Sequence, residues 1–247
     1  MKSAVQARWG LALVAVWLAQ ASAQAQTWSA NLGVVSDYRF RGVSQTRLQP
    51  AMQGGLDYVD ISGWYLGLWG SNIRWVKDAG AQAGSVELDL YGGYRWQHAQ
   101  VNYDLGVLRY DYVANDLGRS GRRGNASTTE VALAATRAQT TLKYSHTLTR
   151  WLGYPDSQGS GYIEISRPWP VAAGWTLVPH LGYLNVRRTQ PSASYTDYAL
   201  TLQKNLAPAW QFAASLQGTN ADRSVYSTPS GDFTGRTALL LGLKYAR

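Results

Sequence analysis

Apolar and polar residues alternate one by one along most of the chain after its first 25 residues. In the segment 28–40, the even positions from Trp28 to Phe40 are mostly apolar and the odd positions are mostly polar. Because a β-strand points successive side chains to opposite faces, this segment is predicted to be a strand with one apolar face. An ordinary strand has about 5–6 residues, whereas crossing a bilayer takes roughly 9–11, so this one is long enough to cross.

The alternation returns along the whole chain, which predicts about twelve strands. The segments are 28–40, 50–58, 64–72, 85–96, 101–112, 128–136, 140–148, 161–167, 175–186, 195–203, 210–218 and 237–247. Each segment alone is a weak signal, but twelve in succession are typical of a membrane barrel. Pro179 fits least well, because proline has no N–H for the hydrogen-bond ladder.

Long and short connections alternate strictly between these segments. The long connections are 42–49, 73–84, 113–127, 149–160, 187–194 and 219–236, and the short ones are 59–63, 97–100, 137–139, 168–174 and 204–209. Outer-membrane barrels have short periplasmic turns and longer extracellular loops. The sequence therefore predicts an all-β fold, a transmembrane antiparallel up-and-down β-barrel, with both ends of the chain in the periplasm. A soluble barrel would instead turn its apolar face inward.

The first 25 residues interrupt the alternation and read as a targeting segment. Lys2 and Arg8 precede an apolar run over 9–19, and small residues follow at positions 21, 23 and 25. This pattern predicts a cleaved secretory signal peptide over 1–25 and a mature barrel over 26–247, with an N-terminal anchor helix as the alternative. The apolar run is too short to span a membrane. We therefore expect export to the outer membrane of a Gram-negative bacterium.

The composition agrees with this assignment. Only 15% of the residues are charged, against roughly 25% in soluble domains, while 45% are hydrophobic, which excludes a disordered chain. The absence of cysteine excludes disulfides and cysteine-ligated metal sites, and no cofactor is expected. Loss of Lys2 and Arg8 with the signal peptide lowers the formal charge from +8 to +6.

Aromatic residues gather near the ends of the predicted strands. Six tryptophans lie toward the predicted periplasmic ends, at 28, 64, 96, 169, 175 and 210. Six other rings lie toward the outer ends, namely Tyr38, Phe40, Tyr110, Tyr112, Tyr183 and Tyr195. This placement predicts two interfacial belts of aromatic side chains, although aromatic residues favour any β-strand.

Several short motifs resemble the Gcw_chp family, also called TorF-type porins. They are SDYRFRGVSQT at 36–46, QGGLDY at 53–58, GWYLGLWGSN at 63–72, ELDLYGGY at 87–94 and YDY at 110–112. The resemblance implies an outer-membrane β-barrel, which the barrel assembly machinery would insert. The chain departs from the usual pattern at its end, Tyr245-Ala246-Arg247, where a terminal aromatic residue is missing.

If the apolar face meets lipid, the opposite face lines the interior with charges of both signs. The candidate pore-lining residues are Asp37, Arg39, Arg41, Asp57, Glu87, Asp89, Arg95, Asp104, Glu130, Lys143, Glu164, Asp197 and Lys244. Such charges could set an ion preference, or they could pair and plug the barrel. Eight-stranded barrels are filled by side chains and those of 16–18 strands are open, so twelve strands leave both interpretations standing.

Five further arginines form a predicted basic cluster in the extracellular loops, Arg119, Arg122, Arg123, Arg187 and Arg188. They could attract anions to the mouth of the barrel, bind lipopolysaccharide phosphates, or simply be solvated. Nucleic acid is not an expected partner, because export and alternation explain the chain without it.

Three function classes follow from these observations. The first is an outer-membrane channel or porin for passive diffusion of small polar or ionic solutes. The second is a plugged structural or adhesive barrel. The third, a lipid-acting enzyme, would need a His–Ser pair near the outer rim, and no nucleophile motif accompanies His98, His146 or His180. The sequence therefore favours a non-enzymatic channel.

Overall fold

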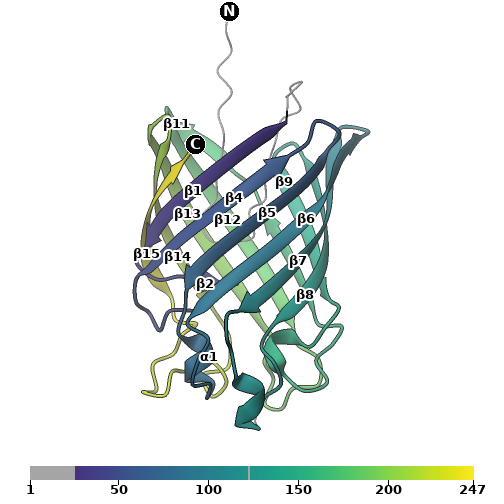
Figure 1. Ribbon diagram of the computed structural model, residues 1–247. Helices are drawn as coiled ribbons and strands as arrows, with labels where there is room; N and C mark the ends of the chain where they lie inside the picture. Colours follow the sequence, from purple (N-terminus) through teal and green to yellow (C-terminus); the bar gives the residue numbers. More distant parts are fainter. Residues whose placement is uncertain (1–25, 122) are drawn as a thin grey trace, which may run out of the picture.

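The computed structural model describes residues 26–121 and 123–247 and forms a closed antiparallel β-barrel (Figure 1). The predicted signal peptide, 1–25, lies outside the described residues. The wall consists of β1 (Thr27–Val35), β4 (Ala51–Val59), β5 (Trp64–Asn72), β6 (Val86–His98), β7 (Val101–Tyr112), β8 (Thr128–Arg137), β9 (Thr140–Thr147), β10 (Gly161–Ser166), β12 (Trp175–Asn185), β13 (Tyr195–Ala207), β14 (Trp210–Thr219) and β15 (Ala238–Ala246). The predicted all-β fold of about 12 strands is confirmed.

Neighbouring strands along the chain pair with each other, and β1 closes the barrel by pairing with both β4 and β15. Gly33 marks the closure, since it lies opposite Gln53 on one side and Lys244 on the other. Within each strand, alternate residues point to opposite faces of the sheet, and the register aligns the inward-facing residues of neighbouring strands. The polar positions of every strand therefore face the interior together.

One wall position is shared by two short strands, because Pro179 interrupts the ladder. Both β10 and β11 (Trp169–Ala172) pair with β12, and the break between them lies opposite Pro179. The carbonyl of Pro179 accepts a hydrogen bond from Arg167 N, but proline offers no N–H in return. The predicted turn at 168–174 is therefore mostly strand, and the turn itself is confined to 173–174.

The two ends of the barrel differ, as the connection lengths predicted. The turn end carries the short connections and the C-terminus, and the loop end carries the long connections (Figure 1). Short helical pieces occur in the long loops: α1 (Trp75–Asp78), η1 (Leu117–Ser120) and η2 (Trp151–Gly153). In the ranges that the structure describes, no helix has the length and apolar character to cross a membrane.

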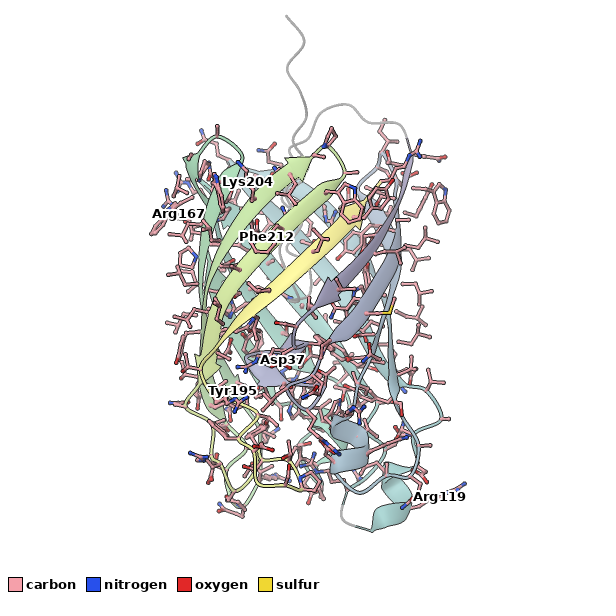
Figure 2. The ribbon with its side chains drawn as sticks, turned by 90° about the vertical axis from the view of Figure 1, so that its left-hand side faces the viewer. Asp37, Arg119, Arg167, Tyr195, Lys204 and Phe212 are labelled. Carbon is pink, nitrogen blue, oxygen red and sulfur yellow. The ribbon has the colours of Figure 1, made fainter. Side chains whose placement is uncertain are left out.

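The outer face of the barrel is apolar and exposed on all sides. Leu32, Met52, Leu66 and Leu239 are each more than 60% exposed, and similar side chains surround the barrel. An exposed apolar surface of this extent marks a face that contacts lipid or protein. Figure 2 shows the outward side chains along the strands.

At the turn end, tryptophan and tyrosine rings contact one another in pairs. Ring centroids lie 5.0 Å apart in Trp28–Tyr58 and Trp64–Tyr94, and 5.2 Å apart in Trp96–Tyr103 and Trp210–Tyr245. These aromatic pairs agree with the belt of aromatic side chains predicted at the turn end.

The second predicted belt, at the loop end, is wrong for five of its six rings. Tyr183 is exposed, but the other five rings are buried: Tyr38, Phe40, Tyr110, Tyr112 and Tyr195. The wall tyrosines share the parity of the inward charges, since Tyr110 pairs with Asp89 and Tyr112 with Glu87. These rings pack inside the barrel.

Candidate functional site

The chain turns into the barrel after β1 and forms a hairpin inside it. This inward hairpin, residues 36–49, contains β2 (Arg39–Phe40) and β3 (Val43–Ser44), and every residue over 37–46 is buried. The predicted wall strand 28–40 is therefore too long, because β1 ends at Val35. Asp37, Arg39 and Arg41 belong to the hairpin and not to the wall.

A tight turn at Arg41 and Gly42 forms the tip of the inward hairpin. Both residues have positive φ, 49° and 77°, as two-residue hairpin turns of this hand require. A Cβ on residue 42 would lie 2.6 Å from Thr219 Cγ2 and 2.9 Å from Asp197 Cβ. Glycine is therefore needed here both for the turn and for the close approach to β13 and β14.

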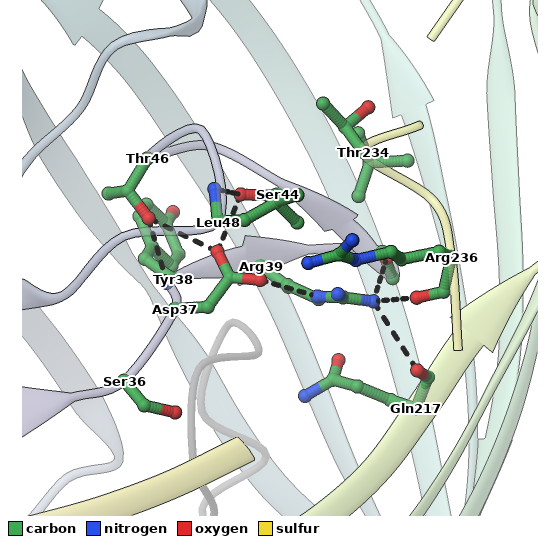
Figure 3. Close-up of polar contacts among 12 residues, drawn as sticks. Ser36, Asp37, Tyr38, Arg39, Ser44, Thr46, Leu48, Gln217, Thr234 and Arg236 are labelled. Atoms are coloured by element: carbon green, nitrogen blue, oxygen red, sulfur yellow. Dashed lines mark hydrogen bonds and ion pairs between the residues drawn. The ribbon is translucent and has the colours of Figure 1, made fainter. Parts of the chain in front are cut away.

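The Asp37 carboxylate holds the base of the inward hairpin together (Figure 3). Its Oδ1 accepts hydrogen bonds from the hydroxyls of Ser44 and Thr46, and its Oδ2 accepts one from Arg39 Nε at 2.9 Å. The Ser44 hydroxyl oxygen also accepts from Leu48 N at 2.8 Å. These contacts join both arms of the hairpin to one buried carboxylate.

Arg39 fastens the inward hairpin to the wall and to the last long loop. Its side chain is fully buried, and Nη1 lies 2.6 Å from the carbonyl oxygen of Arg236 and 3.3 Å from those of Gln217 and Gly42 (Figure 3). The backbone N–H of Ser44 donates to Thr234 O at 3.0 Å. The hairpin is thus tied to β14 and to the loop that follows it.

Arg41, at the tip of the inward hairpin, contacts strands on the far side of the barrel. Its Nη2 lies 2.8 Å from Glu130 Oε2 on β8, and its guanidinium carbon lies 4.1 Å from the Tyr162 ring centre on β10. The same carbon lies 4.7 Å from the Trp151 ring centre and 4.8 Å from that of Phe40. Because β8 and β10 each lie five strands from β1 in opposite directions, the inward hairpin spans the interior.

A buried polar network continues from Tyr162 along β10, β12 and β13. The Tyr162 hydroxyl donates to Asp197 Oδ2 at 2.9 Å and lies 3.1 Å from His180 Nε2, which is 3.0 Å from Asp197 Oδ1. On its other side, His180 Nδ1 lies 3.6 Å from Glu164 Oε2, and Lys143 Nζ lies 3.4 Å from Glu164 Oε1. Charges on four strands are thus linked under the hairpin tip.

We expect Tyr162→Phe to lower the free energy of unfolding by about 1–3 kcal/mol, because it leaves buried partners without the hydroxyl. Urea unfolding of the folded barrel in lipid or detergent measures this change. Tyr198→Phe is the control, since its hydroxyl contacts Thr237 at a position that is 41% exposed. A cost for Tyr162→Phe no larger than the control's would contradict the role of this network.

Nearer the turn end, the inward charges are also paired. Arg95 Nε lies 2.9 Å from Asp104 Oδ2, and the Arg95 guanidinium lies over the Tyr65 ring at 4.1 Å. Asp57 accepts a hydrogen bond from the Tyr91 hydroxyl and interacts electrostatically with Lys244. All six of these groups lie at inward positions of the register, as the alternation predicted for the charged ones.

Glu87 and Asp89 on β6 face inward without a basic partner among the described residues. Glu87 is 1% and Asp89 is 7% exposed. Glu87 Oε2 and Asp89 Oδ1 have no hydrogen-bond partner in the described part of the chain. The two carboxyl groups point the same way, because residues two apart in a strand share a face.

The predicted basic cluster is divided between two loops. Arg119 is exposed on η1, and Arg123 stacks on the Tyr154 ring at 3.8 Å. Arg187 contacts Gln158 O at 3.3 Å and Arg188 is exposed, while Arg122 lies outside the described residues. Both groups border the long loop that contains η2, and Figure 2 places Arg119 at the far tip of the loop end.

The histidines at the outer face and at the turn end are not part of the buried network. His146 lies 3.3 Å from the Tyr144 hydroxyl on the outer face, and His98 ends β6 at the turn end. Within the described ranges, no group of three or more His, Asp or Glu side chains is arranged to hold a metal ion.

Sequence reasoning missed the aromatic partners of Arg41, above all Trp151 and Tyr162. Tyr162 alternates in phase with the inward charges, and Gly42 is a residue type that often marks a turn. Trp151 lies in a loop, outside any alternation, so its contact with the hairpin had no local signal.

A closed 12-stranded barrel with an apolar outside and a charged inside has the architecture of a porin, and solved porins share it. The KdgM porin is 7% identical with a TM-score of 0.55, and the match covers 88% of this chain and 98% of that chain. The NanC porin is 10% identical with a TM-score of 0.55, covering 89% and 99%. The chain itself belongs to the Gcw_chp family, described as bacterial proteins of unknown function, whose model matches residues 19–245. No curated protein matches the chain.

Proposed function

We propose that the protein is an outer-membrane channel of the porin type, through which small polar or ionic solutes diffuse passively. The observation that carries this proposal is the separation of the two faces of one closed sheet. The outer face exposes apolar side chains throughout, and the inner face holds thirteen charged candidate residues on wall and hairpin. A bilayer suits this arrangement, because a closed sheet pairs its strands all the way round and the polar residues avoid lipid.

In this proposal the loop end faces the cell exterior and the turn end faces the periplasm. Short periplasmic turns and long external loops support this orientation, as does the belt of aromatic pairs at the turn end. The signal peptide would direct export, and the barrel assembly machinery would insert the barrel. Exposed loop arginines such as Arg119 and Arg188 would then lie near lipopolysaccharide phosphates.

The inward hairpin makes the proposed channel narrow. It spans the interior near the loop end, so solutes would pass beside it. One solved KdgM structure is described as a complex with disordered oligogalacturonate. An acidic ligand of that kind does not suit the interior of this barrel, because its inward charges include more acids than bases.

A plugged structural barrel is the second candidate, and the same hairpin favours it. Arg39 and Arg41 hold the hairpin through buried contacts on opposite walls, which is the anchoring expected of a permanent plug. An enzymatic function gains no comparable support, since His180 contacts Tyr162 and Asp197 inside the barrel and His146 contacts Tyr144.

Solute uptake into proteoliposomes distinguishes the two candidates. Mature protein folded into vesicles should let small sugars and amino acids enter, and the rate should fall steeply with solute size because of the hairpin. Heat-modifiable migration on a gel verifies that the barrel is folded. Vesicles that hold folded protein and exclude even the smallest solutes would favour the plug.

A further inference from the structure

The inward charges do not cancel, and their excess is acidic. Among residues 26–121 and 123–247, five lysines and arginines face the interior and each has an acidic partner: Arg39 with Asp37, Arg41 with Glu130, Arg95 with Asp104, Lys143 with Glu164 and Lys244 with Asp57. Three acids are left over, Glu87, Asp89 and Asp197. In the described part of the chain, Asp197 has hydrogen-bond contacts with His180 and the Tyr162 hydroxyl and no lysine or arginine partner.

The size of this acidic excess depends on protonation, but the interior does not become basic. With His180 neutral and all acids ionised, eight acids and five bases leave the interior at −3. Two buried carboxyl groups on one face, Glu87 and Asp89, can share a proton, and His180 can take one from solution. These two events leave −1, and protonation of both carboxyl groups together with His180 leaves the interior neutral, not basic.

The positive charge of the chain therefore lies elsewhere. Residues 26–247 carry +6, and since the interior carries −3, the remaining surface carries +9. Arg119, Arg187 and Arg188 are exposed members of that set on the long loops. The positive charge thus lies outside the interior, in part on the long loops, while the interior is acidic.

Resting on the proposed channel function, we infer that the interior selects cations, and that Glu87 and Asp89 on β6 are its selectivity-determining residues. Acidic side chains inside a pore favour cations over anions. The solutes are inorganic monovalent cations and small organic amines. The loop arginines, which the sequence linked to anion attraction, do not decide the preference.

Salt screening determines which charges dominate. The Debye length is about 10 Å at 0.1 M salt and about 3 Å at 1 M, so exposed loop arginines lose their influence as salt rises. Charges enclosed by protein are screened much less. Cation preference should therefore persist at 1 M salt, where a preference set by the loops would vanish.

The test is the ratio of K⁺ to Cl⁻ permeability, obtained from reversal potentials across planar bilayers in a KCl gradient. The wild-type ratio should exceed one at both low and high salt. The double variant Glu87→Gln, Asp89→Asn should bring the ratio at least twofold closer to one. Asp111→Asn is the matched control, because Asp111 lies on neighbouring β7 but faces outward beside Arg109, and it should leave the ratio unchanged.

A wild-type preference for Cl⁻ would overturn the inference and leave the channel standing. A cation preference that Arg119→Ala with Arg123→Ala alters, and the β6 double variant does not, would overturn the assignment to Glu87 and Asp89. Folded protein that carries no current would instead refute the proposed function itself.

Discussion

Arg41→Ala is expected to release the tip of the inward hairpin from the far wall. The substitution removes an ion pair to Glu130 whose two side chains are each 3% exposed, together with contacts to three aromatic rings. Loss of one partner from a buried pair costs about 3–5 kcal/mol, because the other charge stays buried and unpaired. Hydrogen exchange of the amides over 39–44 should therefore accelerate by about a hundredfold or more, since each 1.4 kcal/mol is a factor of about ten.

The control for this change is Arg109, an arginine of the barrel whose ion pair is exposed to solvent or lipid. Arg109 pairs with Asp111 at 3.2 Å, but the two side chains are 39% and 44% exposed. Exposed pairs contribute about 0–1 kcal/mol, so Arg109→Ala should leave exchange in the hairpin unchanged. Unchanged protection of 39–44 in Arg41→Ala would show that Arg39 and Asp37 hold the hairpin without the tip. Arg41→Lys should fall between, because lysine keeps the charge without the planar fork.

Leu133→Arg should lower the free energy of unfolding in lipid vesicles by about 2–4 kcal/mol. Leu133 lies midway along β8 on the outer face and is 46% exposed, so the new charge would enter the middle of the bilayer. A basic side chain costs this much at the midplane of a membrane barrel. Denaturant titration of folded protein in vesicles measures the difference.

Leu148→Arg provides the matched comparison at a different depth. Leu148 is also on the outer face and is 47% exposed, but it directly follows the loop end of β9. The same charge costs only about 0–1 kcal/mol near an interface. Equal costs at the two positions would contradict a bilayer around the barrel, because a soluble or protein-covered surface has no such depth dependence.

The barrel wall was readable from the sequence because lipid and interior impose opposite polarity on alternate residues. The predicted segments 64–72 and 101–112 coincide with β5 and β7, and most other ends agree within a few residues. The connection lengths also predicted which ends of the strands lie together. Pro179 was recognised as a poor fit, and the structure places the break in the wall opposite it.

The inward hairpin was not predicted, because alternation cannot distinguish a strand in the wall from one inside the barrel. Asp37, Arg39 and Arg41 continue the parity of β1, so they were read as its extension. Their partners are Gln217, Arg236 and Glu130, which are distant in sequence. Only the tertiary fold brings those groups to the hairpin, and only there does the buried charge find compensation.

The loop-end aromatic residues show the same limit in another form. Their position near strand ends predicted a belt. Tyr110 and Tyr112, however, pair with the inward-facing Asp89 and Glu87 and pack inside the barrel. Parity, applied to the rings as it was to the charges, would have placed them correctly. Their hydroxyls and faces surround the hairpin, as the Tyr110 hydroxyl bonded to Glu130 illustrates.

Whether solute passes beside the hairpin is tested most directly by single-channel recording in planar bilayers. Mature protein, folded and heat-modifiable, should give discrete current steps that disappear when it is denatured before addition. The steps should be larger for Arg41→Ala, because the hairpin tip no longer spans the interior. A silent bilayer for both folded proteins would contradict a channel and identify the barrel as plugged.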